Sequence, residues 1–427
     1  MKKILILTYE MFPYTNNWGG CQRVHYMANK LSETEDVTVI ASENLIEKNS
    51  RIAKRQEYKT LFLSNKLHTK IYNSPNRYSA KASPKKHGVV SKVILAMSSI
   101  INRLFFNEPN QNIGIVAYLW MLLHTGEILS YIRNNQIEFV IVSIPPWNII
   151  RISLLKKMRK SGCKIIIDYR DPWNCWNGRK GMPFFKERRI LRLVDGVFVT
   201  NENHLERLMK DFSLNPNKLH VIMNGYDSML WDSVKVNMTN RTNDYLVMSY
   251  VGAISFAHDS FRNPKLFLEA LALFEHKDRI IFRVVGHYDE AIISEYNNTI
   301  PHFEMIPSVS QNESFVKMQE SDILINFHTI EDESSKYLIA GKIFDYYRSG
   351  ARLLSINGTE SFERKFVQDH HLGYYSENKL QQLKSTIENI YQDWISCDKF
   401  CVRRKKYDLT YSRQFQNDKV LKVLYEL

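Results

Sequence analysis

Cysteine is scarce in this sequence, and its spacing suits neither a disulfide framework nor a metal site. The 427 residues include five cysteines, which are Cys21, Cys163, Cys175, Cys397 and Cys401. None has the C-x-x-C spacing of a zinc site, and the last two have no paired histidine. A sparse and odd set of cysteines is typical of a reducing compartment. We therefore expect a cytoplasmic protein without a bound metal.

Long apolar runs are absent as well. No stretch reaches the roughly 20 uninterrupted apolar residues of a membrane-spanning helix. Residues 89–106 come nearest but contain Lys92 and Arg103, and the apolar run at 113–123 has only 11 residues. The N-terminal run after Lys2 and Lys3 ends at Glu10, which is too short for a secretory leader. The sequence therefore predicts no spanning helix.

Acidic residues are few in two basic segments. The formal net charge is +13. Residues 51–110 contain 12 Lys and Arg against 2 Asp and Glu, and residues 151–192 contain 13 against 3, so the rest of the chain is net acidic. This uneven division predicts attraction to an anionic partner, whether nucleic acid, anionic lipid or phosphorylated metabolites.

The N-terminal half alternates short apolar runs with amphipathic segments, as parallel α/β sheets do. A strand over 3–8, a glycine-containing turn at 13–20 and a helix over 24–31 are typical of the start of a nucleotide-binding βαβ unit. Helices are expected over 115–132, 149–158 and 203–212. The further strands that we expect lie at 37–41, 139–144, 164–167, 197–200 and 220–223.

The C-terminal half repeats this pattern after a polar stretch without periodicity at 233–244, which we interpret as a linker. The sequence predicts an α/β protein with two Rossmann-like domains, residues 1–232 and 245–405, that face each other across a ligand cleft. Residues 406–427 are expected to form a helix that returns to the N-terminal domain. The strands expected in this half lie at 246–251, 280–285, 322–326 and 353–356, and the helices at 264–274, 313–320, 361–368, 380–394 and 411–424.

Residues 43–112 interrupt the alternation with a basic loop followed by an apolar segment at 88–106. One interpretation is an amphipathic helix that rests on anionic lipid, with Lys92 and Arg103 near its ends. The alternative is a helix packed on the core behind a long loop.

Two carboxylates and an arginine follow the strand expected at 164–167, where residues 168–173 read DYRDPW. Ligands of open parallel sheets bind outside the carboxyl ends of the strands. Asp168, Arg170 and Asp171 are therefore predicted site residues. The alternative is an Asp–Arg turn network before Pro172.

A second candidate site opens a short helix in the C-terminal half, where residues 341–346 read GKIFDY. Gly341 permits close approach of a ligand, and Lys342 adds a positive charge to the N–H groups of a helix N-terminus. Asp345 shares a helix face with Lys342. A phosphate contact beside a hydroxyl contact favours a nucleotide ligand. The alternative is a solvated Lys–Asp pair on an amphipathic helix.

Four stretches, taken in order, resemble GT-B enzymes of glycosyltransferase family 4, the type that builds bacterial surface polysaccharides. The family's donor helix usually has Glu where this chain has Asp345. The matching stretches are Gly19-Gly20 with Arg23, DYRDPW at 168–173 after SIPP at 143–146, NGYD at 224–227, and GKIFDY at 341–346 followed by Gly350.

The resemblance implies a nucleotide-diphosphate sugar donor in the C-terminal half and a transfer that retains anomeric configuration without a metal or other cofactor. Cations would neutralise the diphosphate, and the acidic residue of the helix would bind the ribose. The donor-site residues so implied are the cations Lys342 and Arg262, the acid Asp345, and the glycines Gly252, Gly286 and Gly341.

The resemblance also implies an acceptor in the N-terminal half, either a lipid-linked or another cell-envelope saccharide, at the inner face of the cell membrane. Asp168 and Asp171 would orient or deprotonate its hydroxyl. Its binding residues would be Gly19, Gly20, Arg23 and Arg170.

The chain departs from the family pattern at Tyr337, which stands eight residues before Asp345 where an acid is usual. Glu331 or Glu333 could substitute, and His258 is a candidate sugar contact.

Two other functions stay open. One is a GT-B sugar-nucleotide epimerase. The other is a basic nucleic-acid-binding protein, although the sequence has no known nucleic-acid fingerprint and we expect no such partner.

Overall fold

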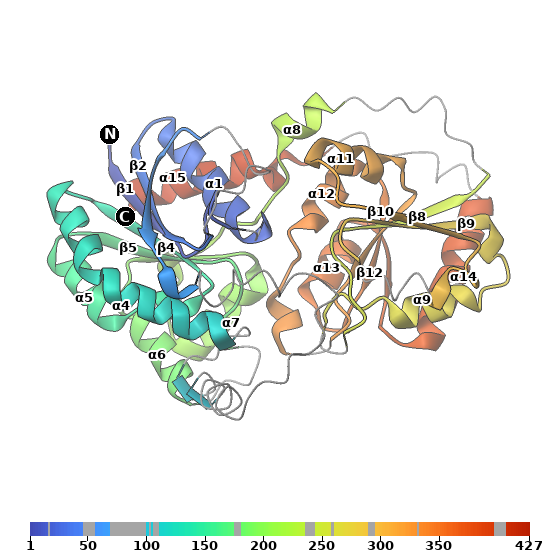
Figure 1. Ribbon diagram of the computed structural model, residues 1–427, viewed down its shortest axis with the longest axis horizontal. Coiled ribbons are helices and arrows are strands. Elements are labelled where there is room, and N and C mark those ends of the chain that lie inside the picture. Colours follow the sequence, from blue (N-terminus) through green and yellow to red (C-terminus); the bar gives the residue numbers. More distant parts are fainter. Residues whose placement is uncertain are drawn as a thin grey trace. The chain divides into compact units, whose positions relative to one another are not determined.

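The chain divides into two compact units, each built on its own parallel sheet (Figure 1). Unit 1 comprises residues 1–223 and 414–427, and unit 2 comprises residues 224–413. The computed structural model describes residues 1–15, 18–45, 56–68, 100–101, 104–105, 111–174, 181–234, 244–257, 260–288, 295–330, 333–396 and 407–427.

The sheet of unit 1 has seven strands in the order β3-β2-β1-β4-β5-β6-β7. All its strand pairs are parallel, and the order reverses between β1 and β4, as in doubly wound folds. Its strands are β1 (Lys3–Leu7), β2 (Asp36–Glu43), β3 (Lys59–Ser64), β4 (Phe139–Ile144), β5 (Lys164–Tyr169), β6 (Gly196–Val199) and β7 (Leu219–Val221).

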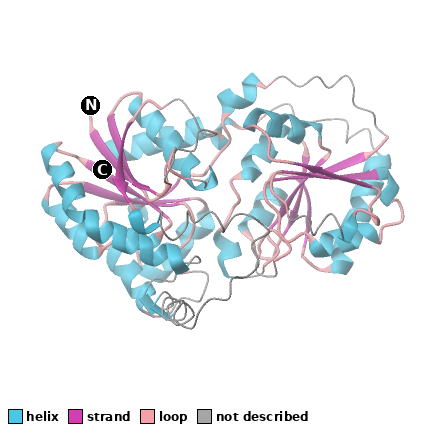
Figure 2. Cartoon of the chain, in the orientation of Figure 1, coloured by secondary structure: helices cyan, strands magenta, loops and turns pink. Residues whose placement is uncertain are grey.

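Helices cover both faces of this sheet (Figures 1 and 2). On one face lie α4 (Gln111–Asn134), α5 (Ile152–Lys160), α6 (Met182–Leu191) and α7 (Glu202–Phe212). On the other face, α1 (Trp18–Ser32) packs beside α15 (Arg413–Glu426). Val420, Val423 and Leu424 of α15 share a buried cluster with Ile4 and Ile6 of β1, so the last helix belongs to the N-terminal unit, as the sequence predicts.

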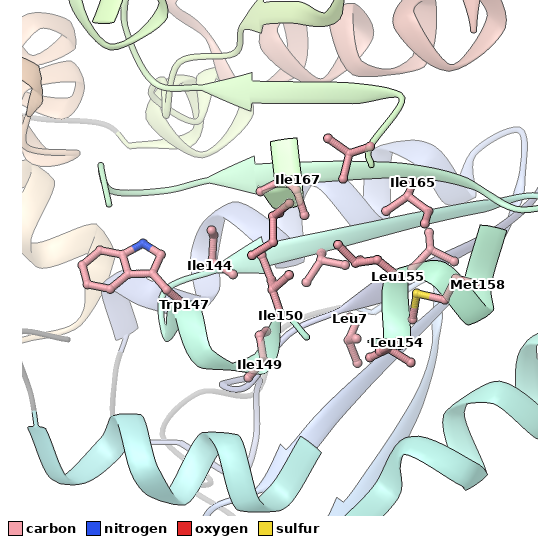
Figure 3. Close-up of a cluster of buried hydrophobic side chains, with 14 of the residues drawn as sticks. Leu7, Ile144, Trp147, Ile149, Ile150, Leu154, Leu155, Met158, Ile165 and Ile167 are labelled. Atoms are coloured by element: carbon pink, nitrogen blue, oxygen red, sulfur yellow. The ribbon is translucent and has the colours of Figure 1, made fainter. Parts of the chain in front are cut away.

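The core of unit 1 follows from strands that are apolar on both faces. Figure 3 shows Leu7, Ile144 and Ile167 from β1, β4 and β5 against Leu154 and Met158 of α5. Each of these side chains is at most 1% exposed. Full burial of such a side chain stabilises the fold by about 1.5–3 kcal/mol. This packing fixes the carboxyl ends of the strands, which carry the candidate site.

Unit 2 repeats the architecture with six parallel strands in the order β10-β9-β8-β11-β12-β13. The order reverses between β8 and β11. The strands are β8 (Leu246–Val251), β9 (Ile280–Val285), β10 (His302–Ile306), β11 (Ile323–Phe327), β12 (Arg352–Ile356) and β13 (Gly373–Ser376).

The helices of unit 2 begin at polar capping residues where the sequence provides them. The capping box Ser310–Glu313 opens α11 (Gln311–Glu320), and Ser361 caps α13 (Phe362–Asp369). The helices α9 (Lys265–Ala272) and α14 (Leu380–Ser396) share a core cluster. The others are α8 (Ser228–Ser233) and α12 (Lys342–Ser349).

The expected strands and helices lie close to the observed ones, with five omissions. The sequence did not predict β3, β10, β13, α6 or α8. Most of the apolar segment expected at 88–106 as a helix, and most of the linker expected at 233–244, lie outside the described residues. Within the described part, α4 is long and apolar enough to cross a bilayer by length and composition. Its buried side, however, packs on the sheet through residues such as Trp120 and Ile128.

Candidate functional site

In unit 2, Lys342 reaches the carboxyl end of β8, where the strand order reverses. Its Nζ donates a hydrogen bond of 3.0 Å to the carbonyl oxygen of Val251, the last residue of β8. The same ammonium lies 3.9 Å from the centroid of the Tyr250 ring, a cation–π contact. Open parallel sheets bind ligands at this point. The first residue of α12 therefore presents its charge at the expected ligand position.

The Lys342 ammonium is desolvated, and no carboxylate of the described residues is paired with it. Burial, and then the positive charge of Arg262, lower the pKa of Lys342 well below its ordinary value. The carboxylate of Glu363 opposes this shift. Glu363 is itself engaged, because it accepts hydrogen bonds from Asn326 Nδ2 at 2.8 Å and from Ser355 Oγ at 2.5 Å. A bound anion beside Lys342 would favour its charged form and oppose this lowering of the pKa.

Arg262 lies in the exposed loop between β8 and α9, with its guanidinium toward the same region. Its backbone carbonyl accepts a hydrogen bond of 3.2 Å from the Ser255 N–H, which closes the loop. Across the described residues, neither Arg262 nor Lys342 is within ion-pair distance of a carboxylate. In the described part of the chain, these two cations without a paired carboxylate make the end of β8 a candidate anion site.

The three glycines predicted to face a ligand have different physical roles. Gly252, at φ +143°, makes room for Lys342, since a Cβ there would lie 2.7 Å from Nζ. Gly286, at φ +139°, packs on the backbone of Gly252, and a Cβ would lie 2.2 Å from the Gly252 carbonyl oxygen. Gly341 has an ordinary helical φ of −56°, and a Cβ there would meet only Asn224 Nδ2 at 3.8 Å. The positive φ favours glycine at both Gly252 and Gly286, contact with backbone also excludes a Cβ at Gly286, and Gly341 has space for one.

Asp345, one turn after Lys342, contacts a residue that the sequence analysis missed. Its Oδ1 accepts a hydrogen bond of 3.0 Å from Trp231 Nε1 of α8. Trp231 is 2% exposed and stacks on Phe315 of α11 with ring centroids 4.0 Å apart. The ion pair of Arg348 with Asp232 adds a second contact between α12 and α8. Asp345 is therefore held in place by α8.

In unit 1, Asp168 ends β5 as an engaged carboxylate. It accepts hydrogen bonds from Arg23 Nε at 2.9 Å and Nη2 at 2.7 Å, and from Ser143 Oγ at 2.8 Å. Both side chains of the ion pair are nearly inaccessible, at 6% exposed for Arg23 and 0% for Asp168. Arg23 also donates to the Ile222 carbonyl at 2.7 Å. This geometry suits Asp168 to holding Arg23 rather than to accepting a proton.

Arg170 connects the loop after β5 to the first turn of α1. Its Nη1 donates to the carbonyl of Gly20, and its Nη2 donates to the carbonyl of Pro145 after β4. Gly19, beside Gly20, has open space where a Cβ would lie. The predicted acceptor residues Gly20, Arg23 and Arg170 are thus brought together at one edge of the sheet.

Asp171 differs from Asp168 although only two residues separate them. Burial raises the pKa of Asp171, and the positive charges of Arg170 and Arg23 oppose the shift. Within the described part of the chain its carboxylate has no hydrogen bond or ion pair. A carboxyl with a raised pKa beside two arginines is a suitable proton acceptor. Of the two candidate bases, the geometry therefore favours Asp171.

A buried carboxyl that the sequence analysis did not identify supports this loop. Glu187 of α6 accepts hydrogen bonds from Tyr169 Oη at 3.0 Å and from Asn174 Nδ2 at 2.8 Å. Burial raises its pKa to about 7, against the opposing charge of Arg207. The two contacts flank residues 170–173 and hold that segment to α6.

Three other predicted contacts have different outcomes. Glu331 and His258 lie outside the described residues. Glu333 accepts a hydrogen bond of 3.3 Å from Tyr337 Oη, so tyrosine and acid lie side by side. No group of three or more metal-ligating side chains occurs among the described residues.

Comparison with solved structures identifies the fold. The chain is similar over its full length to sucrose-phosphate synthase from Thermosynechococcus elongatus, with a TM-score of 0.68, 11% identity and 99% of that chain covered. It is likewise similar to Anabaena HepE in complex with UDP, with a TM-score of 0.60, 10% identity and 100% of both chains covered. These likenesses establish the GT-B fold that the sequence predicted.

The same fold also includes enzymes of another class. UDP-GlcNAc 2-epimerase from Methanocaldococcus jannaschii matches with a TM-score of 0.54 and 9% identity, and both chains are covered completely. No protein-family model and no curated protein sequence matches this chain. The fold alone therefore does not separate transferase from epimerase chemistry.

Proposed function

We propose that the protein is a glycosyltransferase that uses a nucleotide-diphosphate sugar as donor. The observation that carries this proposal is the pair of cations without counter-charges, Lys342 and Arg262, at the carboxyl end of β8. A diphosphate supplies the missing negative charge. The likeness to a structure in complex with UDP supports this choice of ligand.

In the proposed reaction the bond between the anomeric carbon and the β-phosphate oxygen breaks, and a bond to the acceptor oxygen forms. Negative charge develops on the departing diphosphate. Fixed cations at that position lower the barrier, by about 3–4 kcal/mol for a single well-placed donor. Lys342 and Arg262 have this role in the proposal. We further propose, from the resemblance to family 4, that no metal is needed and that anomeric configuration is retained.

Unit 1 binds the acceptor in this proposal. The Asp171 carboxylate takes the proton of the acceptor hydroxyl, and Arg170, Arg23 and the segment at Gly19 and Gly20 bind the saccharide. Asp168 acts through Arg23. If Asp171 is the base, the rate falls as pH decreases through its raised pKa, because the protonated carboxyl cannot accept a proton. Asp171→Asn should abolish this acid limb and slow transfer by about 10²–10⁴-fold. An unchanged pH profile would exclude Asp171.

A thermal-shift series tests the donor site directly. A ligand that binds only the folded state raises its apparent stability. Nucleoside diphosphates and their sugars should raise the Tm of the wild type but not of Lys342→Ala. Lys365→Ala, an exposed lysine on α13, is the matched control and should respond as the wild type does. Equal shifts in all three proteins would contradict the assignment of the site.

The epimerase alternative is supported by the matching epimerase structures. Incubation with donor alone distinguishes the two functions. A new free sugar nucleotide would identify an epimerase. Transfer to an added acceptor, with release of the nucleoside diphosphate, would identify a transferase.

We also propose a lipid-linked or cell-envelope acceptor and a location at the inner face of the membrane. One surface of unit 1 supports this. Leu122 and Leu123 of α4 and Phe185 of α6 are 43%, 78% and 56% exposed. Between these helices lies α5, whose exposed residues include Lys156 and Lys157 (Figure 1). Apolar anchors beside cations suit an anionic bilayer.

Vesicle sedimentation tests this surface. The full chain should bind phosphatidylglycerol vesicles and not phosphatidylcholine vesicles. Leu123→Glu should weaken the binding, whereas Leu273→Glu, at another well-exposed leucine in unit 2, should not. Binding that is equal for both variants and the wild type would place any membrane contact elsewhere.

A further inference from the structure

A cavity of about 660 Å³ opens in unit 1 at the amino ends of the strands, the edge of the sheet opposite Asp168. It is lined by residues that precede or begin β1, β4 and β5 and by the ends of α4 and α5. Its charged side chains are four cations and one acid, which are Lys2, Arg133, Lys160, Lys164 and Glu138, and the α-carboxylate of Leu427 belongs to the lining as well.

The four cations have no counter-charge. Across the described residues, none of them is within ion-pair distance of a carboxylate. Glu138 is engaged with the backbone, since its Oε1 accepts a hydrogen bond of 3.0 Å from the Lys3 N–H. The lining therefore carries a net positive charge in a concave surface, where low-dielectric walls concentrate the field.

Interaction with a helix C-terminus accounts for the position of only two of the four cations. Arg133 and Lys160 lie in the last turns of α4 and α5, where cations interact favourably with the helix dipole. Lys2 and Lys164 belong to no helix. Lys2 Nζ is held 4.8 Å from the centroid of the Phe139 ring and 5.2 Å from that of Tyr425. Its charge is thus positioned over a structured wall of the cavity.

We infer that this cavity is a second anion site and binds a phosphate-bearing ligand. Lysine and arginine are the side chains that bind phosphate oxygens most strongly. The volume is that of a small-molecule pocket, and Ile132, Ile137 and Phe139 give it an apolar floor. Phosphate attached to an organic group matches both features. Free phosphorylated metabolites and lipid headgroups share this chemistry.

A titration of the full chain at low salt tests the inference. The probes are inorganic pyrophosphate, a nucleoside diphosphate, and vesicles of phosphatidylglycerol or phosphatidylcholine. The variant is Lys2→Ala/Lys164→Ala, and the matched control is Lys210→Ala/Lys365→Ala, which removes two exposed lysines outside the cavity. Lys2→Arg/Lys164→Arg keeps the charge and should bind as the wild type does.

We expect the cavity variant to bind at least one probe about tenfold more weakly than the control, because it loses two charge contacts. Loss of pyrophosphate or nucleotide binding identifies a soluble ligand, and loss of phosphatidylglycerol binding alone identifies a headgroup. If the variant and the control bind every probe equally, the inference is wrong. Binding of nucleoside diphosphate to Lys342→Ala measures the donor site separately. Failure of the proposed donor site can therefore be distinguished from failure of the second anion site.

Discussion

The two units place charge at the carboxyl ends of their sheets in opposite ways. In unit 1 the two arginines of this region have partners within the unit, since Arg23 binds Asp168 and Arg170 donates to the carbonyls of Gly20 and Pro145. In unit 2 the Lys342 ammonium has a carbonyl and an aromatic ring as its partners but no acid. Two sheets of the same type thus carry different charge arrangements. The arginines of unit 1 are bonded within the unit, whereas Lys342 of unit 2 is not paired with an acid of the described residues.

This difference supports the proposal that the donor site lies in unit 2. A desolvated cation without a counter-charge lowers stability until an anion binds. A satisfied network instead fixes its members in place and gains little from a charged ligand. We infer that unit 2 binds the diphosphate, and that unit 1 provides a rigid surface for a neutral saccharide, with Asp171 as the candidate base.

The largest effect is expected from breaking the network of unit 1. Asp168→Ala leaves the Arg23 guanidinium buried without its carboxylate, which should reduce the free energy of unfolding by about 3–5 kcal/mol. Urea unfolding of the full chain measures this loss. Asp36→Ala, which breaks the exposed pair with Lys59 in the same unit, is the control and should change stability little. Equal losses in the two variants would contradict the comparison.

The next largest effect is expected from the glycines of unit 2. Gly286→Ala should destabilise the fold by about 1–3 kcal/mol for its backbone conformation alone, and contact with the Gly252 carbonyl adds to this cost. Gly341→Ala should be neutral or stabilise by about 0.4–1 kcal/mol, because its φ suits alanine. Thermal unfolding of both variants shows which of them is the less stable. A Gly341→Ala variant that is as unstable as Gly286→Ala would refute the packing argument.

The sheets could be predicted because their central strands are continuous apolar runs. The buried parallel strands β1 and β4 have this pattern. The three missed strands, β3, β10 and β13, all lie at sheet edges. Every residue of β10 is only partly buried, so its sequence lacks the apolar run that a central strand shows.

The sequence predicted which residues lie at the candidate site, but it did not predict what each of them does there. Asp168 and Asp171 look equivalent in the sequence. They differ because Arg23, which is 145 residues from Asp168, occupies one carboxylate and not the other. The sequence did not indicate that Trp231 belongs to the site, because a lone tryptophan before a polar stretch does not predict a hydrogen bond to Asp345. Pairings over such distances depend on the tertiary fold.

A smaller effect sharpens the argument about unit 2. Because the pKa of Lys342 is lowered in the folded state, the unfolded chain binds more protons between that pKa and the ordinary value of 10.5. Stability should therefore rise with pH within this window, and the cost of the desolvated charge is fully present below it. Lys342→Met should remove the term and be more stable than the wild type at low pH. Urea unfolding from pH 7 to pH 10 tests this, and parallel curves for the two proteins would contradict it.

The smallest effect concerns Asp345, and it separates a ligand contact from a purely structural one. Trp231→Phe keeps the stacking on Phe315 but removes the indole N–H that Asp345 accepts. We expect a loss of about 0.5–1.5 kcal/mol in unfolding free energy, because the half-buried Asp345 carboxylate loses one hydrogen bond. Trp394→Phe, at a half-buried tryptophan of α14, is the control. If Asp345 also binds the donor ribose, Trp231→Phe should raise the Kd for nucleoside diphosphate in calorimetric titration. A loss of stability with an unchanged Kd would mean that Asp345 only joins α12 to α8, and that donor recognition in unit 2 rests on the cations alone.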